Sequence, residues 1–370
     1  LTRSNNKDTI ESYWKDSCPS NLFFHYYDLP KFWIWAKHHG LPVNIYYACW
    51  LQGSCQFAMK IHRKCHFDMA HHITFGVFRD ASTLYKLKIP YVIGPVGGGE
   101  MTPPKLLRLY TRKERIMEGF RSCANQISRF NPWLIKSFNN ASLILTKTND
   151  TKTLLKKWDA KTFVSLEIGI NDIQNDIPNH CHNNTFLFIG RFTYWKGVQL
   201  ALLAFAKYAK KHPDSKLIFI GKGEMENDII TFSNKNGLEK NISIIQWLKQ
   251  EELKHYYSSS RAMLFPSLHD SSGNVVLEAL SFGLPVICLD CGGPASVLGD
   301  SLRELTVDTK GKDVQDVVNG LYEKIEIISK DDGYHKDLRT KCLCRAKAML
   351  WSETVKNSYI NIQKILLPNL

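Results

Sequence analysis

The chain has 370 residues, of which 44% are hydrophobic and 22% are charged. This composition excludes a disordered chain and predicts a folded protein with room for two domains of ordinary size. No apolar run reaches the roughly 18 residues that a membrane-spanning helix requires. The 48 Lys and Arg residues outnumber the 35 Asp and Glu residues, which gives a formal net charge of +13. Such a surface favours anionic partners: nucleic acid, anionic lipid or a phosphorylated substrate.

The ten cysteines are scattered along the chain. Cys288 and Cys291 form a lone CxxC motif without a second pair, so no zinc site is predicted. Free thiols in a reducing compartment fit this pattern better, and we expect a cytoplasmic location.

The N-terminal half alternates apolar runs with amphipathic stretches, which is typical of an α/β domain. Strands are predicted over residues 22–27, 67–71, 91–94, 142–146 and 162–168. Helices are predicted over residues 43–64, 77–87, 103–130 and 150–158. Leu1 to Arg3 have the pattern of a strand that is ending, so we expect a chain that lacks the first β-α unit of this domain.

The C-terminal half shows the same alternation more clearly. Strands are predicted over residues 185–190, 215–220, 241–245, 262–266 and 285–289. Helices are predicted over residues 197–211, 224–236, 250–259 and 274–282, with a final amphipathic region over 337–367. Strands that alternate with helices form a parallel sheet, and ligands bind beyond the carboxyl ends of its strands.

A polar run without apolar periodicity separates the two halves and predicts a linker. We expect an N-terminal domain over residues 1–172, a linker over 173–184, a C-terminal domain over 185–345 and a closing helix over 346–370. The predicted fold class is α/β.

Two cations follow the first strand of the C-terminal half. Arg191 lies directly after the strand, and Lys196 precedes the helix that begins near Gly197. Beyond the end of a parallel strand such a pair can clamp a diphosphate. Two solvated charges on a loop would give the same pattern.

A loop rich in Ser, Gly and Asn opens the helix predicted over residues 274–282. The free backbone N–H groups at such a helix start suit an anion. Glu278 lies about one turn inside this otherwise apolar helix, where a carboxylate needs polar partners. Ribose hydroxyls would supply them, and so would a nearby Lys or Arg.

Taken together, these motifs resemble those of the family 4 glycosyltransferases, which have the GT-B fold. The matching motifs, in the family's order and spacing, are Arg191, Lys196-Gly197, Gly221-x-Gly223, Asp270-x7-Glu278, Gly283-x-Pro285 and Gly292-Gly293-Pro294. The resemblance is specific across about residues 180–300 and extends more weakly over the whole chain. It implies two Rossmann-like domains that face a cleft, with the closing helix crossing back onto the N-terminal domain. It also implies transfer of a sugar from a nucleotide-diphosphate donor, with retention of configuration and without a cofactor or an essential metal.

The resemblance further implies a role for each matching residue. Arg191 and Lys196 would hold the departing diphosphate, and Glu278 would bind the ribose hydroxyls. Asp270 would contact the transferred sugar, although it is one methylene shorter than the family's Glu. The remaining implied donor contacts are backbone contacts, from Gly273, Asn274 and Val275 to the phosphates and from around Gln246 and Trp247 to the base, with Gln246 standing where the family often has Gly.

Two segments of the N-terminal half resemble cleft-facing segments of bacterial family members. One carries His71, His72 and Thr74, and the other carries Gly97, Gly98 and Gly99. Side chains alternate along a strand, so we expect one imidazole to face the cleft. We take it to be His72, which could orient an acceptor hydroxyl or accept its proton. The alternatives are a structural histidine and a flexible glycine loop.

Residues 105–115 combine Leu106, Leu107 and Leu109 with five basic side chains. Such a segment could lie on an anionic membrane and present the cleft to a lipid-linked acceptor, or it could be an ordinary surface helix.

The sequence therefore predicts a glycosyltransferase that acts on a saccharide or lipid-linked saccharide, and the basic segment would place it peripherally at the inner face of the cell membrane. Another GT-B enzyme, such as a nucleotide-sugar 2-epimerase, lacks the Asp270-x7-Glu278 motif in this setting. A basic nucleic-acid-binding protein is the alternative from a different class, but no zinc-finger, RNP-like or helix-turn-helix motif supports it, and we expect no nucleic acid as a partner. Without the first β-α unit, we expect the chain to bind nucleotide weakly and to transfer little sugar.

Overall fold

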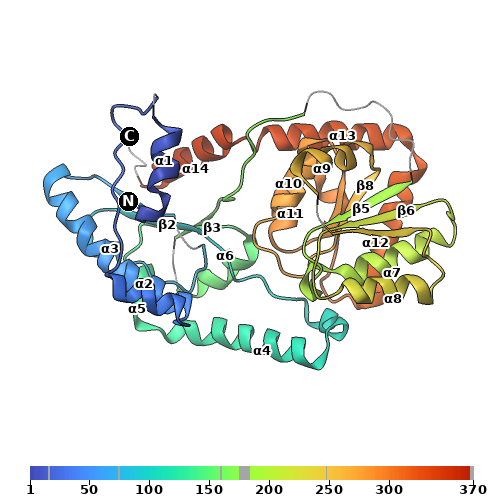
Figure 1. Ribbon diagram of the computed structural model, residues 1–370, viewed down its shortest axis with the longest axis horizontal. Helices are drawn as coiled ribbons and strands as arrows, with labels where there is room; N and C mark the ends of the chain where they lie inside the picture. Colours follow the sequence, from blue (N-terminus) through green and yellow to red (C-terminus); the bar gives the residue numbers. More distant parts are fainter. Residues whose placement is uncertain (16, 74–75, 159–160, 175–183, 247, 367–370) are drawn as a thin grey trace.

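The computed structural model describes residues 1–366, except 16, 74–75, 159–160, 175–183 and 247. It contains two separate parallel β-sheets, one from each half of the chain, with helices packed around both (Figure 1). The predicted α/β class is therefore confirmed. No helix in the described part of the chain combines the length and the apolar character that crossing a bilayer requires.

The first sheet has the strand order β1-β2-β3-β4, and every neighbouring pair is parallel. Its strands are β1 (Ala70–His72), β2 (Tyr91–Val96), β3 (Leu143–Thr146) and β4 (Thr162–Val164). The two central strands are buried along their whole length, as expected for apolar runs that are covered on both faces.

The second sheet has the order β10-β9-β8-β5-β6-β7, again with parallel neighbours. Its strands are β5 (Thr185–Ile189), β6 (Lys216–Ile220), β7 (Ile242–Ile245), β8 (Ala262–Phe265), β9 (Val286–Leu289) and β10 (Thr306–Val307). The chain winds outward in one direction from β5 and then in the other from β8. This doubly wound order opens a crevice at the carboxyl ends of β5 and β8.

The helices of the C-terminal half cover this sheet. They are α7 (Val198–Ala209), α8 (Glu226–Lys235), α9 (Gln250–Ser259), α10 (Asn274–Ser281), α11 (Gly292–Leu298), α12 (Val314–Lys330) and α13 (Asp332–Lys347). Helix α7 is apolar on most of its circumference and packs against α12, so nearly all of its side chains are buried. One continuous hydrophobic core fills this half of the molecule.

The N-terminal half is held by three smaller hydrophobic clusters. Its helices are α1 (Lys7–Tyr13), α2 (Lys31–His38), α3 (Val43–Cys65), α4 (Arg112–Ile127), α5 (Pro132–Asn139) and α6 (Asn149–Leu155). Helix α4 lies along an outer edge of the molecule (Figure 1). The 3-10 helix η3 (Pro104–Leu109) precedes it, and Leu106 of η3 is buried in the core of the C-terminal half.

The final helix α14 (Trp351–Leu366) returns to the first sheet. Ile362 of α14 packs with Val92, Leu143 and Leu145 of β2 and β3. The start of the helix is fixed by the Trp351 backbone N–H, which donates to the Ile170 carbonyl at 3.0 Å.

Two predicted elements of the N-terminal half are wrong. Residues 22–27 add no strand to the sheet, since Tyr26 makes an isolated bridge with Thr2. Residues 77–83 are not helical, because the Phe78 N–H donates to the Gly97 carbonyl at 3.0 Å and the backbone here pairs in an isolated bridge. Helical geometry in this stretch is limited to η2 (Leu84–Leu87). Helices α1, α2, α5, α11 and α12 were not predicted from the sequence.

The packing of α14 gives a test of how far the first sheet depends on it. Ile362→Ala should destabilise the protein by about 2–5 kcal/mol, because it leaves a cavity against β2 and β3. Ile360→Ala on the same helix, where the side chain is 37% exposed, is the matched control. Urea unfolding of both variants measures the difference, and equal stabilities would contradict the assigned packing.

Candidate active site

The loops that follow β5 and β8 meet at the crevice of the second sheet. Helix α7 begins directly after Gly197, which has a positive φ of 76°. A Cβ atom at this position would collide with the carbonyl oxygen of Pro266 in the loop after β8. Glycine therefore allows the two loops to pack backbone to backbone, and it brings Lys196 close to the β8 loop.

Lys196 and Asp270 form an ion pair across these loops. Their side chains are 17% and 15% exposed, so the pair is largely shielded from solvent. The Lys196 ammonium also lies 5.0 Å from the ring centroid of Phe265. Arg191 lies nearby, with its guanidinium 5.8 Å from the centroid of Trp195, and it is exposed. The structure thus gathers three of the predicted donor residues.

The loop after β8 continues into α10 through Gly273, which has a positive φ of 76° and is buried against Gly293 and Pro294. The Gly293 N–H donates to the Asp270 carbonyl at 2.6 Å, which fixes the loop against the start of α11. Asn274 and Val275 form the first turn of α10, so their backbone N–H groups belong to the open start of a helix.

Glu278 lies on α10 and lines a pocket of about 660 Å³. The Tyr257 hydroxyl donates to Glu278 Oε2 at 3.2 Å. Desolvation raises the pKa of the Glu278 carboxyl, and the hydrogen bond from Tyr257 opposes that rise. The pocket is also lined by Asn274, Lys254 and Trp351, so α9, α10 and α14 all contribute to it.

A pocket of about 420 Å³ lies between the two halves of the molecule, beside the Lys196–Asp270 pair. From the C-terminal half it is lined by Arg191, Trp195, Lys196, His269, Asp270 and Ser271. From the N-terminal half it is lined by Gly76, Val77, Gly98, Glu100, Arg121 and Lys147. We refer to this pocket as the cleft.

The predicted glycine loop lies at the cleft. A Cβ atom on Gly97 would come within 2.9 Å of the Ser271 side chain, so glycine allows the two halves to approach closely here. Glu100 fixes the loop: it accepts from the Gly98 N–H at 2.8 Å, from Thr148 Oγ1 at 2.6 Å and from Thr151 Oγ1 at 2.9 Å. Gly99 packs against Thr151, with no room for a side chain. The loop is therefore built into the fold and is not a flexible linker.

The two predicted histidines lie elsewhere. His72 Nε2 is 3.0 Å from the Tyr47 hydroxyl on α3, and burial lowers the pKa of His72 to about 4. His71 makes contacts of 2.9 Å with the Gly94 carbonyl and with the Tyr359 hydroxyl of α14. Neither imidazole is among the residues that line the cleft, so the geometry does not support the predicted catalytic role of His72. Thr74 lies outside the described residues.

Of the two implied base contacts, the structure describes Gln246, which follows β7. Gln246 donates to Glu226 Oε1 at 2.8 Å and lines a separate pocket between α8 and β7. Trp247 lies outside the described residues. The sequence pattern placed both next to the nucleotide on resemblance alone.

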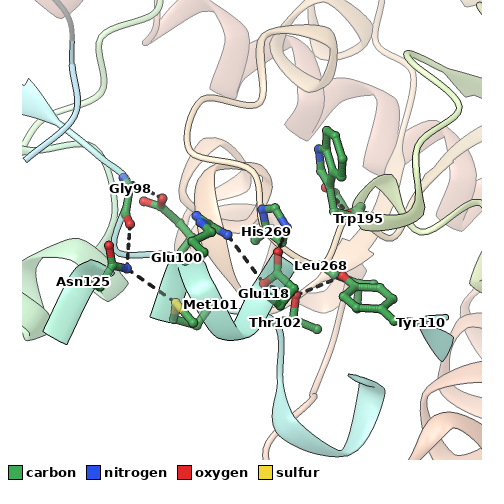
Figure 2. A network of polar contacts seen from close by, with 12 residues as sticks. Gly98, Glu100, Met101, Thr102, Tyr110, Glu118, Asn125, Trp195, Leu268 and His269 are labelled. Carbon is green, nitrogen blue, oxygen red and sulfur yellow. Dashed lines mark hydrogen bonds and ion pairs between the residues drawn. The ribbon is translucent and has the colours of Figure 1, made fainter. Parts of the chain in front are cut away.

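The structure also reveals a polar contact beside the cleft that the sequence did not predict (Figure 2). His269 precedes Asp270 and stacks on Trp195, with ring centroids 5.7 Å apart. Its Nε2 lies 2.9 Å from Glu118 Oε1, and Glu118 comes from α4 in the other half of the chain. Thr102 donates to the second carboxylate oxygen of Glu118 at 3.3 Å. Glu118 could have been suspected because it and Asn125 are polar residues spaced seven apart on one face of α4.

The C-terminal half is similar in sequence to known proteins. Residues 170–341 match the model of the family described as glycosyl transferases group 1. An uncharacterized glycosyltransferase of Methanocaldococcus jannaschii is 33% identical over 183 residues, which cover 45% of this chain and 44% of that protein. The O-antigen chain mannosyltransferase C of Escherichia coli is 25% identical over 58% of this chain and 57% of its own length. The chain spans about half or less of the curated relatives it matches first, between 37% and 50% of their length.

Solved structures extend the comparison to both halves. The sucrose-phosphate synthase of Thermosynechococcus elongatus superposes with a TM-score of 0.57 at 16% identity, over 85% of this chain and 78% of that one. An Anabaena protein solved with UDP and glucose gives a TM-score of 0.54 at 15% identity, over 86% of this chain and 81% of that one. The fold is the GT-B fold. Neither of the alternatives, the 2-epimerase and the nucleic-acid-binding protein, is favoured by these similarities.

The pairing of Glu118 with His269 predicts a pH-dependent contribution to stability. Burial raises the pKa of Glu118, but the hydrogen bond and charge of His269 and the charge of Arg121 outweigh it, so the pKa is lowered from its ordinary value of 4.5. A lowered carboxylate pKa stabilises the fold fully above that value, and the stabilisation is lost as the pH falls through the pKa of the folded state.

Glu118→Gln should therefore be less stable than the wild type by about 1–3 kcal/mol at neutral pH. The difference should shrink as the pH falls below 4.5, the ordinary pKa of the group. Chemical unfolding at several pH values measures it, with Glu239→Gln at an exposed position as the control. A difference that does not change with pH would contradict an ionic contact.

Proposed function

We propose that the protein transfers a sugar from a nucleotide-diphosphate donor to a saccharide or lipid-linked saccharide, as a family 4 retaining glycosyltransferase. The observation that carries the proposal is the ion pair of Lys196 and Asp270 at the carboxyl ends of β5 and β8, beside the open start of α10. The match of residues 170–341 to glycosyl transferases group 1 supports it. Relatives named for O-antigen mannosyl transfer and for transfer to a diphospho-undecaprenol acceptor support the acceptor class.

In this proposal the donor lies along the crevice of the second sheet. Lys196, Arg191 and the first N–H groups of α10 hold the diphosphate, and Glu278 binds the ribose hydroxyls. Positive charge and backbone dipoles aimed at the diphosphate stabilise the charge that develops as it leaves. In the transfer, the bond between the anomeric carbon and the diphosphate oxygen breaks, and a bond from that carbon to an acceptor oxygen forms. The acceptor hydroxyl gives its proton to the departing diphosphate oxygen, so the products are the glycoside and the nucleoside diphosphate.

Asp270 has two roles in this scheme. In the absence of donor its carboxylate pairs with Lys196, so neither charge is left unpaired in a site that is largely shielded from solvent. When a diphosphate binds, Lys196 has a second anionic partner, and the Asp270 carboxylate becomes available to accept hydrogen bonds from the sugar. Arg121 and Lys147 line the opposite wall of the cleft and face the side on which the acceptor would bind.

A panel of nucleotide diphosphates and nucleotide-sugars tests the function directly. Any ligand at 100 times its Kd should stabilise the fold by about 2.7 kcal/mol, which a thermal-shift assay detects. UDP is the first candidate because solved proteins of this fold hold it. If no nucleotide in the panel shifts the melting temperature or supports transfer to any saccharide, the proposal is wrong.

Glu278 should contribute to donor affinity and not to folding. Glu278→Ala should weaken nucleotide binding by roughly 1.5–3 kcal/mol for each charge-assisted hydrogen bond lost to the ribose. Glu323→Ala, an exposed position on α12, is the control and should bind as the wild type does. Calorimetry on the two folded variants measures the effect, and an unchanged affinity in Glu278→Ala would remove that residue from the donor site.

The proposed diphosphate contacts predict that transfer does not depend on a metal. Activity should persist in excess EDTA, because Lys196 and Arg191 supply the positive charge that a divalent cation would otherwise provide. Lys196→Met should lower kcat by more than about tenfold in the same assay, with or without added magnesium. Activity that EDTA abolishes and that manganese or magnesium restores would overturn this assignment.

A further inference from the structure

Helix α4 buries polar side chains and exposes apolar ones, which is the reverse of the usual pattern for a helix on a protein surface. Its buried side chains are Glu118, which contacts His269, and Asn125, which donates to the Gly98 carbonyl in the glycine loop. On the opposite side of the helix, Ile116, Phe120 and Ile127 are 60%, 72% and 62% exposed. A helix that packs on a protein normally buries its apolar stripe and exposes its polar face.

The apolar exposure continues beyond the helix. Phe130 follows α4 and is 79% exposed, and Trp133 at the start of α5 is 69% exposed. We call Ile116, Phe120, Ile127, Phe130 and Trp133 the α4 stripe. These five large apolar side chains are all exposed, and α4 itself lies along an outer edge of the molecule (Figure 1). Such a surface indicates a site that a partner covers.

The charges around the α4 stripe indicate the chemical character of that partner. Between residues 112 and 136 the chain has six basic residues and two acidic ones. Both acidic side chains are engaged within the protein: Glu114 accepts from the Thr111 N–H at 2.7 Å at the helix start, and Glu118 is buried against His269. Arg112, Lys113 and Lys136 are exposed. The surface that meets the partner is therefore apolar, aromatic and cationic.

We infer that the α4 stripe is a docking surface for an anionic lipid bilayer. Apolar and aromatic side chains enter the boundary between headgroups and acyl chains, and the flanking cations meet the anionic headgroups. A second copy of the chain fits less well, because stripe-to-stripe contact would bring the same cations together. Helix α4 spans about 24 Å along its axis, so the contact is extended along the surface.

This surface replaces the one predicted over residues 105–115. Leu106 of that segment is buried in the core of the C-terminal half, and Leu107 and Leu109 pack against the same core. The Lys105 ammonium donates to the Gly311 carbonyl at 2.7 Å. The apolar side chains that the sequence analysis assigned to the membrane are thus used inside the protein, and α4 presents the apolar contact instead.

Co-sedimentation of the full chain with vesicles tests the inference. The probes are vesicles of phosphatidylcholine alone and of phosphatidylcholine with phosphatidylglycerol. The wild type should bind the anionic vesicles and prefer them over the neutral ones. Ile116→Ser, Phe120→Ser and Ile127→Ser combined should weaken binding by about tenfold or more, because apolar area is lost from the contact. The matched control, Ile230→Ser with Ile327→Ser, changes similarly exposed side chains of α8 and α12 and should bind as the wild type does.

A second pair of variants isolates the charges and covers the case in which the serine variant fails to fold. Arg112→Glu with Lys113→Glu should remove most of the preference for anionic vesicles, whereas Arg108→Glu on η3 should have a smaller effect. Three results would overturn the inference: wild-type chain that binds neither vesicle, equal binding by the wild type and the stripe variant, or a dimer in sedimentation equilibrium that only the stripe variant dissociates. The last result would assign the stripe to a second copy of the chain.

Discussion

The contact between the loops after β5 and β8 is the constraint on which the candidate site depends. Gly197 lets the start of α7 press against Pro266, and this approach sets Lys196 opposite Asp270. The same β8 loop carries His269 toward α4 and leads through Gly273 into α10. One close backbone approach therefore positions the diphosphate contacts, the start of α10 and the link to the N-terminal half. A larger residue at position 197 would disturb all three together.

The sequence predicted the C-terminal half well because its elements are locally self-consistent. Each strand is a short apolar run that ends at a turn residue, and α7 is apolar on nearly every side because it is buried on nearly every side. Arg191, Lys196 and Asp270 come together because the strand order makes the ends of β5 and β8 neighbours. The base contact implied around Gln246 stays a prediction, because it would come from the backbone, whereas the structure shows that the side-chain amide pairs with Glu226.

The N-terminal half was predicted less well for a different physical reason. Its apolar residues form three small clusters, so strand and helix signals there are short and are overridden by tertiary contacts. Val77 illustrates this, since its neighbours bond to Gly97 and no helix forms. The partners of His72 and Glu118 could not be predicted, because Tyr47 and His269 lie far away in the sequence. Alternation along β1 correctly separates the two imidazoles, but it does not tell which elements lie on either side.

The return of α14 to the first sheet has a consequence for the order in which the protein matures. The C-terminal core draws all of its strands and most of its helices from one continuous stretch of chain, and it can assemble as that stretch emerges from the ribosome. The first sheet is made earlier but lacks Ile362 until nearly the whole described chain has been synthesised. During translation the apolar side chains of β2 and β3 that contact Ile362 therefore stay uncovered until α14 has been made. A nascent chain that stalls before residue 351 would expose these side chains to chaperones.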